Sequence, residues 1–290
     1  MPSIVIPAFN EENAIAQTIT NLFSMFKNAN IKEVEIVIVD DGSTDKTGEI
    51  AQNTGAKVIR HPHNGGYGQS LKSGIRAASF DTIVICDADG TYPIECIPDM
   101  LKEYEKGFDM VVGARQGAHF EESLKKKILR FILKYIVEST AGRNIPDINS
   151  GLRIFSKKKI LPYFPRLCNT FSFTTSLTLA YMMNGKFVTY MPIPYHKRIG
   201  NTKVRLLKDA IRTMQFIIEA SAFYNPLKIF TMFSICLIVV SGIGIGCSFL
   251  SKISAFYYLA IGTLLVSILM FGLGLIAVLL KQIMTKDYDA

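Results

Sequence analysis

The sequence has no tryptophan and only five cysteines and four histidines among its 290 residues. The cysteines never occur as C-x-x-C, and the histidines form no cluster with them. Structural zinc sites and disulfide frameworks need such spacing, so the pattern argues against both and is typical of a reducing compartment. The first residues, MPSIVIPAFNEE, lack the basic and apolar regions of a signal peptide, so no cleavable leader is expected.

Charged residues make up 19% of the chain and are unevenly distributed. Residues 1–100 carry 7 Lys and Arg against 13 Asp and Glu, whereas residues 101–228 carry 22 against 9. An acidic first third followed by a strongly basic middle indicates a metal-binding half and an anion-facing half.

Two long apolar runs, 229–250 and 253–280, are separated only by Ser251 and Lys252. Each is long enough to cross a hydrocarbon core of about 30 Å as a helix. The alternative is a buried helical pair in a soluble core, but uncharged stretches of this length exceed the usual globular helix. We therefore expect a transmembrane hairpin. Because basic residues crowd its two ends and the turn has only Lys252, both termini are expected to be cytoplasmic.

Before residue 120, short β-rich segments alternate with helical ones, which predicts a mostly parallel sheet in an α/β domain. The predicted strands are SIVIPAF, EIVIVDD, AKVIRH, TIVICDAD and DMVVGAR. Helices are expected to begin near Glu11, Thr44, Gly68 and Pro93, with Asn10 as the cap of the first. The segments 123–140 and 204–224 have an amphipathic, basic pattern. They are either packed helices with a solvated face or interfacial helices, and the nearby hairpin favours the second.

Polar side chains follow three of the predicted strands, at Asn10-Glu11, Asp40-Asp41 and Asp87-Asp89. Ligands of open α/β sheets collect at this carboxyl edge. Asp87 and Asp89 end an apolar run, and two like charges there are most simply explained by a divalent cation, Mg²⁺ or Mn²⁺, shared with a diphosphate. Taken alone the pattern is weak, because turns are rich in aspartate.

The glycine-rich stretch HNGGYGQSLKSG looks at first like a dinucleotide-binding turn. The third-glycine position is Leu71, however, and the stretch follows the third strand rather than the first, so NAD binding is not expected. A packing role or a role on the substrate side remains for these glycines.

The motifs PAFNEE, VDDGSTD, DADGTYP, GAR and DINSGLRIF occur in the order seen in glycosyltransferase family 2, which the whole soluble part resembles. Through HNGGYGQSLKSGI, DINSGLR and RIGNTK followed by membrane helices, the chain most resembles polyprenyl-phosphate glycosyltransferases of the dolichyl-phosphate mannose synthase type. The resemblance implies a GT-A-like (Rossmann-like) α/β domain, followed by amphipathic helices and a two-helix transmembrane hairpin. The implied division is a catalytic domain 1–203, an amphipathic juxtamembrane segment 204–226 and a hairpin with a short cytoplasmic tail 227–290.

The resemblance also implies roles for individual residues. The positions matching the nucleotide-sugar site are Pro7, Ala8, Asn10, Glu11, Asp40, Asp41, Asp87, Arg115 and Lys203. The positions matching catalytic or acceptor-side groups are Asp89, Asp147, Arg153 and Arg198, and the implied metal ligands are Asp87 and Asp89. Arginines suit phosphates because guanidinium pairs with them in a bidentate manner, although each taken singly fits a surface salt bridge. Thr91 stands where some relatives have a glutamine near the metal, which puts a third protein ligand in doubt.

The implied activity is inverting transfer of a hexosyl group from GDP-mannose or a UDP-hexose to dolichyl or undecaprenyl phosphate at the cytoplasmic membrane face. Its partners would be the nucleotide sugar, the lipid phosphate and the membrane, with no nucleic acid and with oligomerisation left open. A first alternative is a hydroxyl acceptor, a glycolipid or polysaccharide, for which Asp147 would be the required base. The second is a non-catalytic membrane scaffold with the same fold.

Overall fold

The computed structural model describes residues 1–31, 33–117, 134–135, 137–139, 141–196, 214–215, 217–220 and 222–286. The chain forms two compact units, Met1–Ile217 and Ile218–Ala290. The predicted interfacial helices at 123–140 and 204–224 lie largely outside the described residues, so the predicted boundary at 203 remains an expectation.

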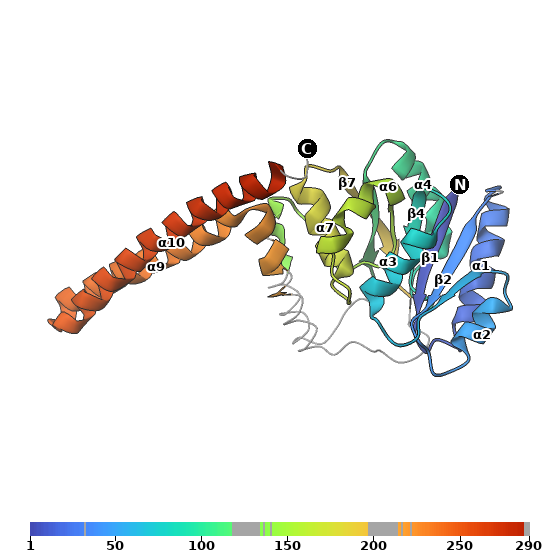
Figure 1. Ribbon diagram of the computed structural model, residues 1–290, viewed down its shortest axis with the longest axis horizontal. Helices are drawn as coiled ribbons and strands as arrows, with labels where there is room; N and C mark the ends of the chain where they lie inside the picture. Colours follow the sequence, from blue (N-terminus) through green and yellow to red (C-terminus); the bar gives the residue numbers. More distant parts are fainter. Residues whose placement is uncertain are drawn as a thin grey trace. The chain divides into compact units, whose positions relative to one another are not determined.

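In the described part of the first unit, seven strands form one sheet in the order β3-β2-β1-β4-β6-β5-β7 (Figure 1). The strands are β1 (Pro2–Ala8), β2 (Glu35–Asp40), β3 (Lys57–Arg60), β4 (Thr82–Ile85), β5 (Met110–Gln116), β6 (Arg153–Ser156) and β7 (Val188–Pro194). All neighbouring pairs are parallel except those of β6, which is antiparallel to both β4 and β5. The prediction of a mostly parallel α/β sheet is confirmed.

All five predicted strands are present, and the sequence analysis missed the other two. Strand β6 begins inside the DINSGLRIF motif, beyond the alternating pattern that ends near residue 120. Strand β7 carries Pro192 and Pro194, which are poor strand residues. It pairs with β5 alone, and an edge strand tolerates proline because one side of its backbone needs no ladder partner.

Helices connect successive strands along the chain and pack against the sheet (Figure 1). They are α1 (Ile15–Asn28), α2 (Thr47–Gln52), α3 (Tyr67–Ala77), α4 (Ile97–Glu105), α6 (Lys157–Ile160) and α7 (Phe173–Met183), with the 3-10 helices η1 (Ile94–Cys96) and η3 (Leu161–Arg166). Ile4 and Ile6 of β1 belong to a buried cluster with residues of α1 and α4. Val5 faces the other way, where a β-carbon on Gly74 of α3 would lie 2.4 Å from it. The period of two along β1 therefore supplies apolar residues to both faces of the sheet.

Asn10 does not cap the first helix, so that expectation was wrong. Helix α1 begins at Ile15, and no side chain caps it. Asn10 adopts a left-handed backbone with φ 52°, and its Oδ1 accepts a hydrogen bond of 2.8 Å from the N–H of Thr44. Its own N–H donates to Oγ of Ser43 at 3.0 Å. The residue joins the loop after β1 to the loop after β2.

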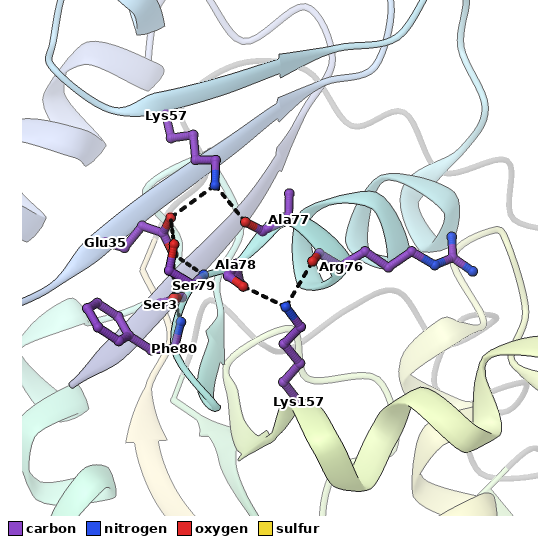
Figure 2. Close-up of polar contacts among 9 residues, drawn as sticks. All are labelled: Ser3, Glu35, Lys57, Arg76, Ala77, Ala78, Ser79, Phe80 and Lys157. Atoms are coloured by element: carbon purple, nitrogen blue, oxygen red, sulfur yellow. Dashed lines mark hydrogen bonds and ion pairs between the residues drawn. The ribbon is translucent and has the colours of Figure 1, made fainter.

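A polar cluster closes the amino-terminal edge of the sheet, opposite the edge where β1 and β2 end (Figure 2). The Glu35 carboxylate accepts hydrogen bonds from Oγ of Ser3 at 2.6 Å and from the N–H of Ser79 at 2.7 Å, and it pairs with Lys57 at 3.2 Å. Burial alone would raise the pKa of Glu35, but these donors hold it below its usual range. Lys57 and Lys157 also donate to the last carbonyl groups of α3, at Ala77 (2.6 Å) and Arg76 (2.9 Å). Cations at a helix C-terminus satisfy its unpaired carbonyls and its dipole.

The second unit consists mainly of two long helices, α9 (Pro226–Ser251) and α10 (Ser254–Lys286). Their apolar windows have mean hydropathies of 2.3 and 2.7, and only 11% of each window is buried. The helices of a soluble core hide their apolar side chains, so this low burial argues against the alternative of a buried pair. By length and composition both are able to cross a membrane.

Small and hydroxyl residues make several close contacts between α9 and α10. Oγ of Ser234 donates to the carbonyl of Ser267 at 3.0 Å, and Oγ of Ser241 donates to that of Ala260 at 2.7 Å. Gly244 faces Ala260 so closely that an added β-carbon would lie 3.0 Å from its side chain. Close backbone approach and hydroxyl hydrogen bonds are the usual means by which helices associate in lipid.

We predict that Glu35→Gln lowers the stability of the protein by about 1.5 kcal/mol, because it weakens hydrogen bonds to a carboxylate that orders three segments. For a unit of this size the unfolding midpoint should fall by roughly 3–6 °C, measured on detergent-solubilised protein. Glu103→Gln is the matched control, because it removes only a surface pair with Lys106 on one helix. Equal midpoints for the two variants would contradict the role of Glu35.

Candidate active site

The polar residues of interest gather at one edge of the sheet because of its topology. Strands β1, β2, β4, β5 and β7 run in the same direction, so their carboxyl ends share this edge. Strand β6 runs the opposite way and pairs Arg153 with Ile85 of β4, so the segment before it arrives at the same edge. The motif at 147–151 is thereby brought beside the motif at 87–91.

Asp87 and Asp89 follow β4 directly, and a hydroxyl group holds one oxygen of each. Oδ1 of Asp87 accepts from the Tyr67 hydroxyl at 2.9 Å. Oδ1 of Asp89 accepts from the Thr91 hydroxyl at 2.6 Å and from its N–H at 3.1 Å. Gly151 packs against Asp87, where an added β-carbon would lie 2.9 Å from both carboxylate oxygens. Both carboxylates are therefore fixed in orientation, and Thr91 positions Asp89.

This pair suits a hard divalent cation that also binds a substrate. Among the described residues there is no group of three or more His, Cys, Asp or Glu side chains able to hold a metal. Two carboxylates are nonetheless sufficient for Mg²⁺ or Mn²⁺ when the remaining positions are taken by phosphate oxygens and water. The donor set thus fits a metal that is bound together with a diphosphate.

Asp40 and Asp41, at the end of β2, are both buried and both hydrogen-bonded to neighbouring loops. Asp40 accepts from the N–H of Ser43 and from Nε of Arg60, each at 3.0 Å. Asp41 accepts from the N–H groups of Gly65 (2.9 Å) and Gly66 (2.8 Å), and its Oδ1 lies 2.7 Å from Nδ1 of His61. Through these hydrogen bonds the two aspartates hold the loops around the expected nucleoside pocket in place.

The remaining residues of that pocket lie in and after β1. Ala8 is buried, and its carbonyl accepts from the N–H of Asp41 at 2.8 Å. Pro7, Asn10 and Glu11 are partly exposed. The N–H of Glu11 donates to Oγ1 of Thr47 at 2.8 Å. Asn10 and Glu11 are thus partly exposed polar residues on a loop that hydrogen bonds hold in place, and their contact with a nucleoside stays a prediction.

Arg115 and Asp147 form a buried, bidentate ion pair. Nε and Nη2 of Arg115 lie 2.7 and 2.9 Å from the two carboxylate oxygens, and the Arg115 N–H donates to the same group at 3.1 Å. Burial would raise the pKa of Asp147, but Arg115 and the N–H of Asn149 hold it below its usual range. Asp147 therefore orients Arg115, and the ion pair between them is not a surface salt bridge. The guanidinium also lies 5.3 Å from the centre of the Tyr195 ring.

Arg153 does not face a phosphate site, which corrects the expectation for this residue. It is 0% exposed, and burial lowers the pKa of its guanidinium. Nε donates to the carbonyl of Ser150 at 2.8 Å, Nη2 to that of Ile148 at 2.8 Å and Nη1 to Oγ1 of Thr178 at 2.7 Å. Its side chain is buried where β6 meets α7, because position 153 opens a strand that is buried on both faces. Its guanidinium holds the 147–151 loop in place through the carbonyl groups of Ile148 and Ser150.

Three tyrosines that the sequence analysis did not single out, Tyr67, Tyr92 and Tyr195, also lie at this edge of the sheet. The Tyr92 hydroxyl accepts from the N–H of Gly151 at 2.6 Å, and its ring lies edge-on to that of Tyr195 with centroids 5.5 Å apart. Tyr67 lies in the glycine stretch HNGGYGQSLKSG and Tyr92 in DADGTYP, so both motifs could have pointed to them. Tyr195 follows strand β7, which the sequence analysis missed.

The glycine stretch has a packing role, one of the two that were left open. Gly66 has φ 97°, and a β-carbon on Gly68 would lie 2.2 Å from the carbonyl oxygen of Cys168. No side chain fits this contact, so α3 starts directly against the 168–169 backbone. Arg198 and Lys203 lie outside the described residues, and their expected phosphate contacts remain predictions.

Comparison with known proteins gives a consistent picture. The model of the family described as "Glycosyl transferase family 2" matches residues 3–164. A dolichyl-phosphate hexose transferase of Haloferax volcanii is 29% identical over 204 residues, which are 70% of this chain and 86% of that protein. An undecaprenyl-phosphate 4-deoxy-4-formamido-L-arabinose transferase of Photorhabdus laumondii is 31% identical over 185 residues, 59% of this chain and 56% of that protein.

Among solved structures, the fold is similar to glucosyl-3-phosphoglycerate synthase of Mycobacterium tuberculosis in complex with Mn²⁺, UDP and phosphoglyceric acid. The TM-score is 0.60 at 18% identity, covering 76% of this chain and 78% of that one. At this identity the likeness shows the fold, which is GT-A-like as expected.

We predict that Asp147→Asn destabilises the protein by about 3 kcal/mol at pH 7, because it leaves the buried Arg115 without its counter-charge. The folded-state pKa of Asp147 is depressed, so its contribution is present above the usual carboxyl value of 3.8 and is lost as the pH falls through the folded-state value. The gap in unfolding midpoint between wild type and variant should therefore shrink below about pH 4. A gap that stays constant from pH 7 to pH 3 would contradict the ion pair.

Proposed function

The chain belongs to glycosyl transferase family 2, and we propose that it transfers a hexosyl group from a nucleoside-diphosphate sugar to a polyprenyl phosphate at a membrane surface. The observation that carries the proposal is the pair Asp87 and Asp89, oriented at the carboxyl end of β4 at the edge where the sheet gathers its polar loops. A carboxylate pair of this kind suits a metal-bound diphosphate.

The donor is a nucleotide sugar such as GDP-mannose or a UDP-hexose. Support comes from the family and from the fold neighbour that binds Mn²⁺ and UDP. In this proposal Pro7, Asn10 and Glu11 contact the nucleoside, while Asp40 and Asp41 hold the loops that enclose it. A bound Mg²⁺ or Mn²⁺ would neutralise charge on the departing diphosphate.

The acceptor is a polyprenyl phosphate, dolichyl or undecaprenyl. Two relatives are named for transfer involving such lipids. The apolar helices α9 and α10 would anchor the enzyme where the lipid resides. Basic residues flank the two helices at Lys228 and Lys281, whereas the turn has only Lys252, which supports cytoplasmic termini and a cytoplasmic catalytic unit.

In the proposed reaction a phosphate oxygen of the lipid attacks the anomeric carbon as the bond to the diphosphate breaks on the opposite face, which inverts the configuration. The nucleophile needs no enzyme base, because a phosphate monoester has a second pKa near 6 and is mostly a dianion at neutral pH. Asp147 is bidentate to Arg115, an arrangement suited to positioning and poorly suited to accepting a proton. Arg198 and Lys203 are proposed to contact the phosphates.

The test of the function is an assay of detergent-solubilised enzyme with labelled UDP- and GDP-sugars and a polyprenyl phosphate in liposomes. Label entering the lipid phase as a phosphate-linked sugar is the expected result. Binding of nucleotide and metal without any transfer, across the whole sugar panel, would instead favour the non-catalytic scaffold.

We predict that Asp89→Asn reduces transfer by a factor on the order of 10² or more while the protein stays folded, since a preorganised charge at the diphosphate is lost. EDTA should abolish wild-type activity, and Mn²⁺ or Mg²⁺ should restore it. Asp99→Asn is the matched control, because Asp99 pairs only with Lys102 on the exposed side of α4. Full activity in chelator would remove the metal from the proposal.

We also predict the acceptor's signature in the pH profile. Transfer to polyprenyl phosphate at low lipid concentration should rise through about pH 6 and level off, following the second ionisation of the phosphate. A polyprenol of the same chain length is the matched acceptor and should receive no sugar. Label in the polyprenol or in a diglyceride, with a profile set by a single enzyme carboxylate, would favour the hydroxyl acceptor.

A further inference from the structure

The hydroxyl of Tyr67 joins the glycine stretch to the proposed metal carboxylates. We infer that Tyr67 is a positioning residue for the divalent cation and acts through Asp87. Residues 65–68, which hydrogen bonds join to both the nucleoside side and the metal side of the site, determine where the Tyr67 hydroxyl lies. The inference rests on the proposed function, because it takes Asp87 as a metal ligand.

The contact between Tyr67 and Asp87 is well defined. The hydroxyl lies 2.9 Å from Oδ1 of Asp87, and Gly151 limits the carboxylate from another side. A carboxylate held at one oxygen cannot rotate about its bond to the β-carbon without losing that hydrogen bond. Groups that orient a metal ligand in this way usually change metal affinity by 10–100-fold when removed.

The Tyr67 ring is itself held in place. It stacks on the ring of Phe171, with centroids 5.8 Å apart and an interplanar angle of 11°. The residues that follow it in α3 are hydrogen-bonded to the 167–169 segment: the N–H of Gln69 donates to the carbonyl of Asn169 at 2.9 Å, and Nζ of Lys72 donates to that of Leu167 at 2.5 Å. The hydroxyl is therefore aimed at Asp87 by the fold.

The other end of the loop is held from the nucleoside side. Asp41 accepts from the N–H groups of Gly65 and Gly66, immediately before Tyr67. His61 lies 2.7 Å from Asp41 and 2.9 Å from Oγ of Ser73 in α3. Hydrogen bonds thus join Ser73 of α3 through His61 and Asp41 to Gly65 and Gly66, and the covalent chain continues to Tyr67, whose hydroxyl contacts Asp87. This path links the two halves of the proposed donor site.

The experiment measures metal binding directly rather than turnover. The full chain in detergent is titrated with Mn²⁺ in the presence of UDP, and separately of GDP, with free Mn²⁺ followed by electron paramagnetic resonance. Tyr67→Phe keeps the stacked ring and removes only the hydroxyl. It should weaken Mn²⁺ binding about tenfold. Nucleotide affinity in EDTA and the unfolding midpoint in EDTA should stay close to those of the wild type.

Two further variants make the test specific. Tyr104→Phe removes a hydroxyl from α4, whose Tyr104 side chain lines a groove with Met1 and Pro2 at the amino-terminal end of β1, and it should leave Mn²⁺ affinity unchanged. Phe171→Leu removes the stacking partner and keeps the Tyr67 hydroxyl, so it should weaken Mn²⁺ binding in the same direction by a smaller factor. If Tyr67→Phe does not fold, Phe171→Leu decides the matter.

The outcomes separate this inference from the proposed function. Wild-type protein that binds no Mn²⁺ with either nucleotide overturns the metal site itself, and with it the inference. Tight wild-type binding that is equal in Tyr67→Phe and Phe171→Leu overturns the inference alone. An equal loss of metal and metal-free nucleotide affinity also overturns it, because Tyr67 would then serve the loop in general rather than Asp87.

Discussion

The guanidinium group of Arg153 is enclosed in the protein core, where it donates to two carbonyl groups of the loop that precedes its own strand and to Oγ1 of Thr178 in α7. Leaving such a charge without hydrogen bonds would cost several kcal/mol, so the carbonyl groups of Ser150 and Ile148 must turn inward to meet it. That requirement fixes the loop. Asp147 then lies against Arg115, and Gly151 lies against Asp87. The shape of the site thus depends on a cation that faces no substrate.

The acidic residues of the site are held in two different ways, which separates their roles. Hydroxyl groups of Tyr67 and Thr91 orient Asp87 and Asp89, and a neutral donor fixes a carboxylate without cancelling its charge. Asp147 is held by a guanidinium, which cancels its charge and lowers its pKa. This difference supports a cation at the first pair and a positioning role for Asp147. It also favours an acceptor that arrives already ionised.

The helices of the second unit carry a different constraint. Most of their apolar side chains are exposed, and apolar surface in water costs about 25 cal/mol for each Å². Their mutual contacts include small residues and hydrogen bonds from the hydroxyls of Ser234 and Ser241. By length and composition the pair suits a lipid environment, which supports the proposed action on a lipid acceptor.

The sequence by itself determined five of the seven described strands, the mostly parallel sheet, the helical hairpin and the placement of Asp87 and Asp89 at a strand end, because hydrophobic periodicity and charge are local properties. It did not determine β6, a four-residue strand whose antiparallel pairing is a property of the whole sheet. The burial of Arg153 follows from that pairing. Motif resemblance therefore named a phosphate-facing residue where the fold required an internal one. The contact of Tyr67 with Asp87 was likewise decided by tertiary structure, since it joins the first residue of α3 to a residue after β4, and only the completed sheet brings these together.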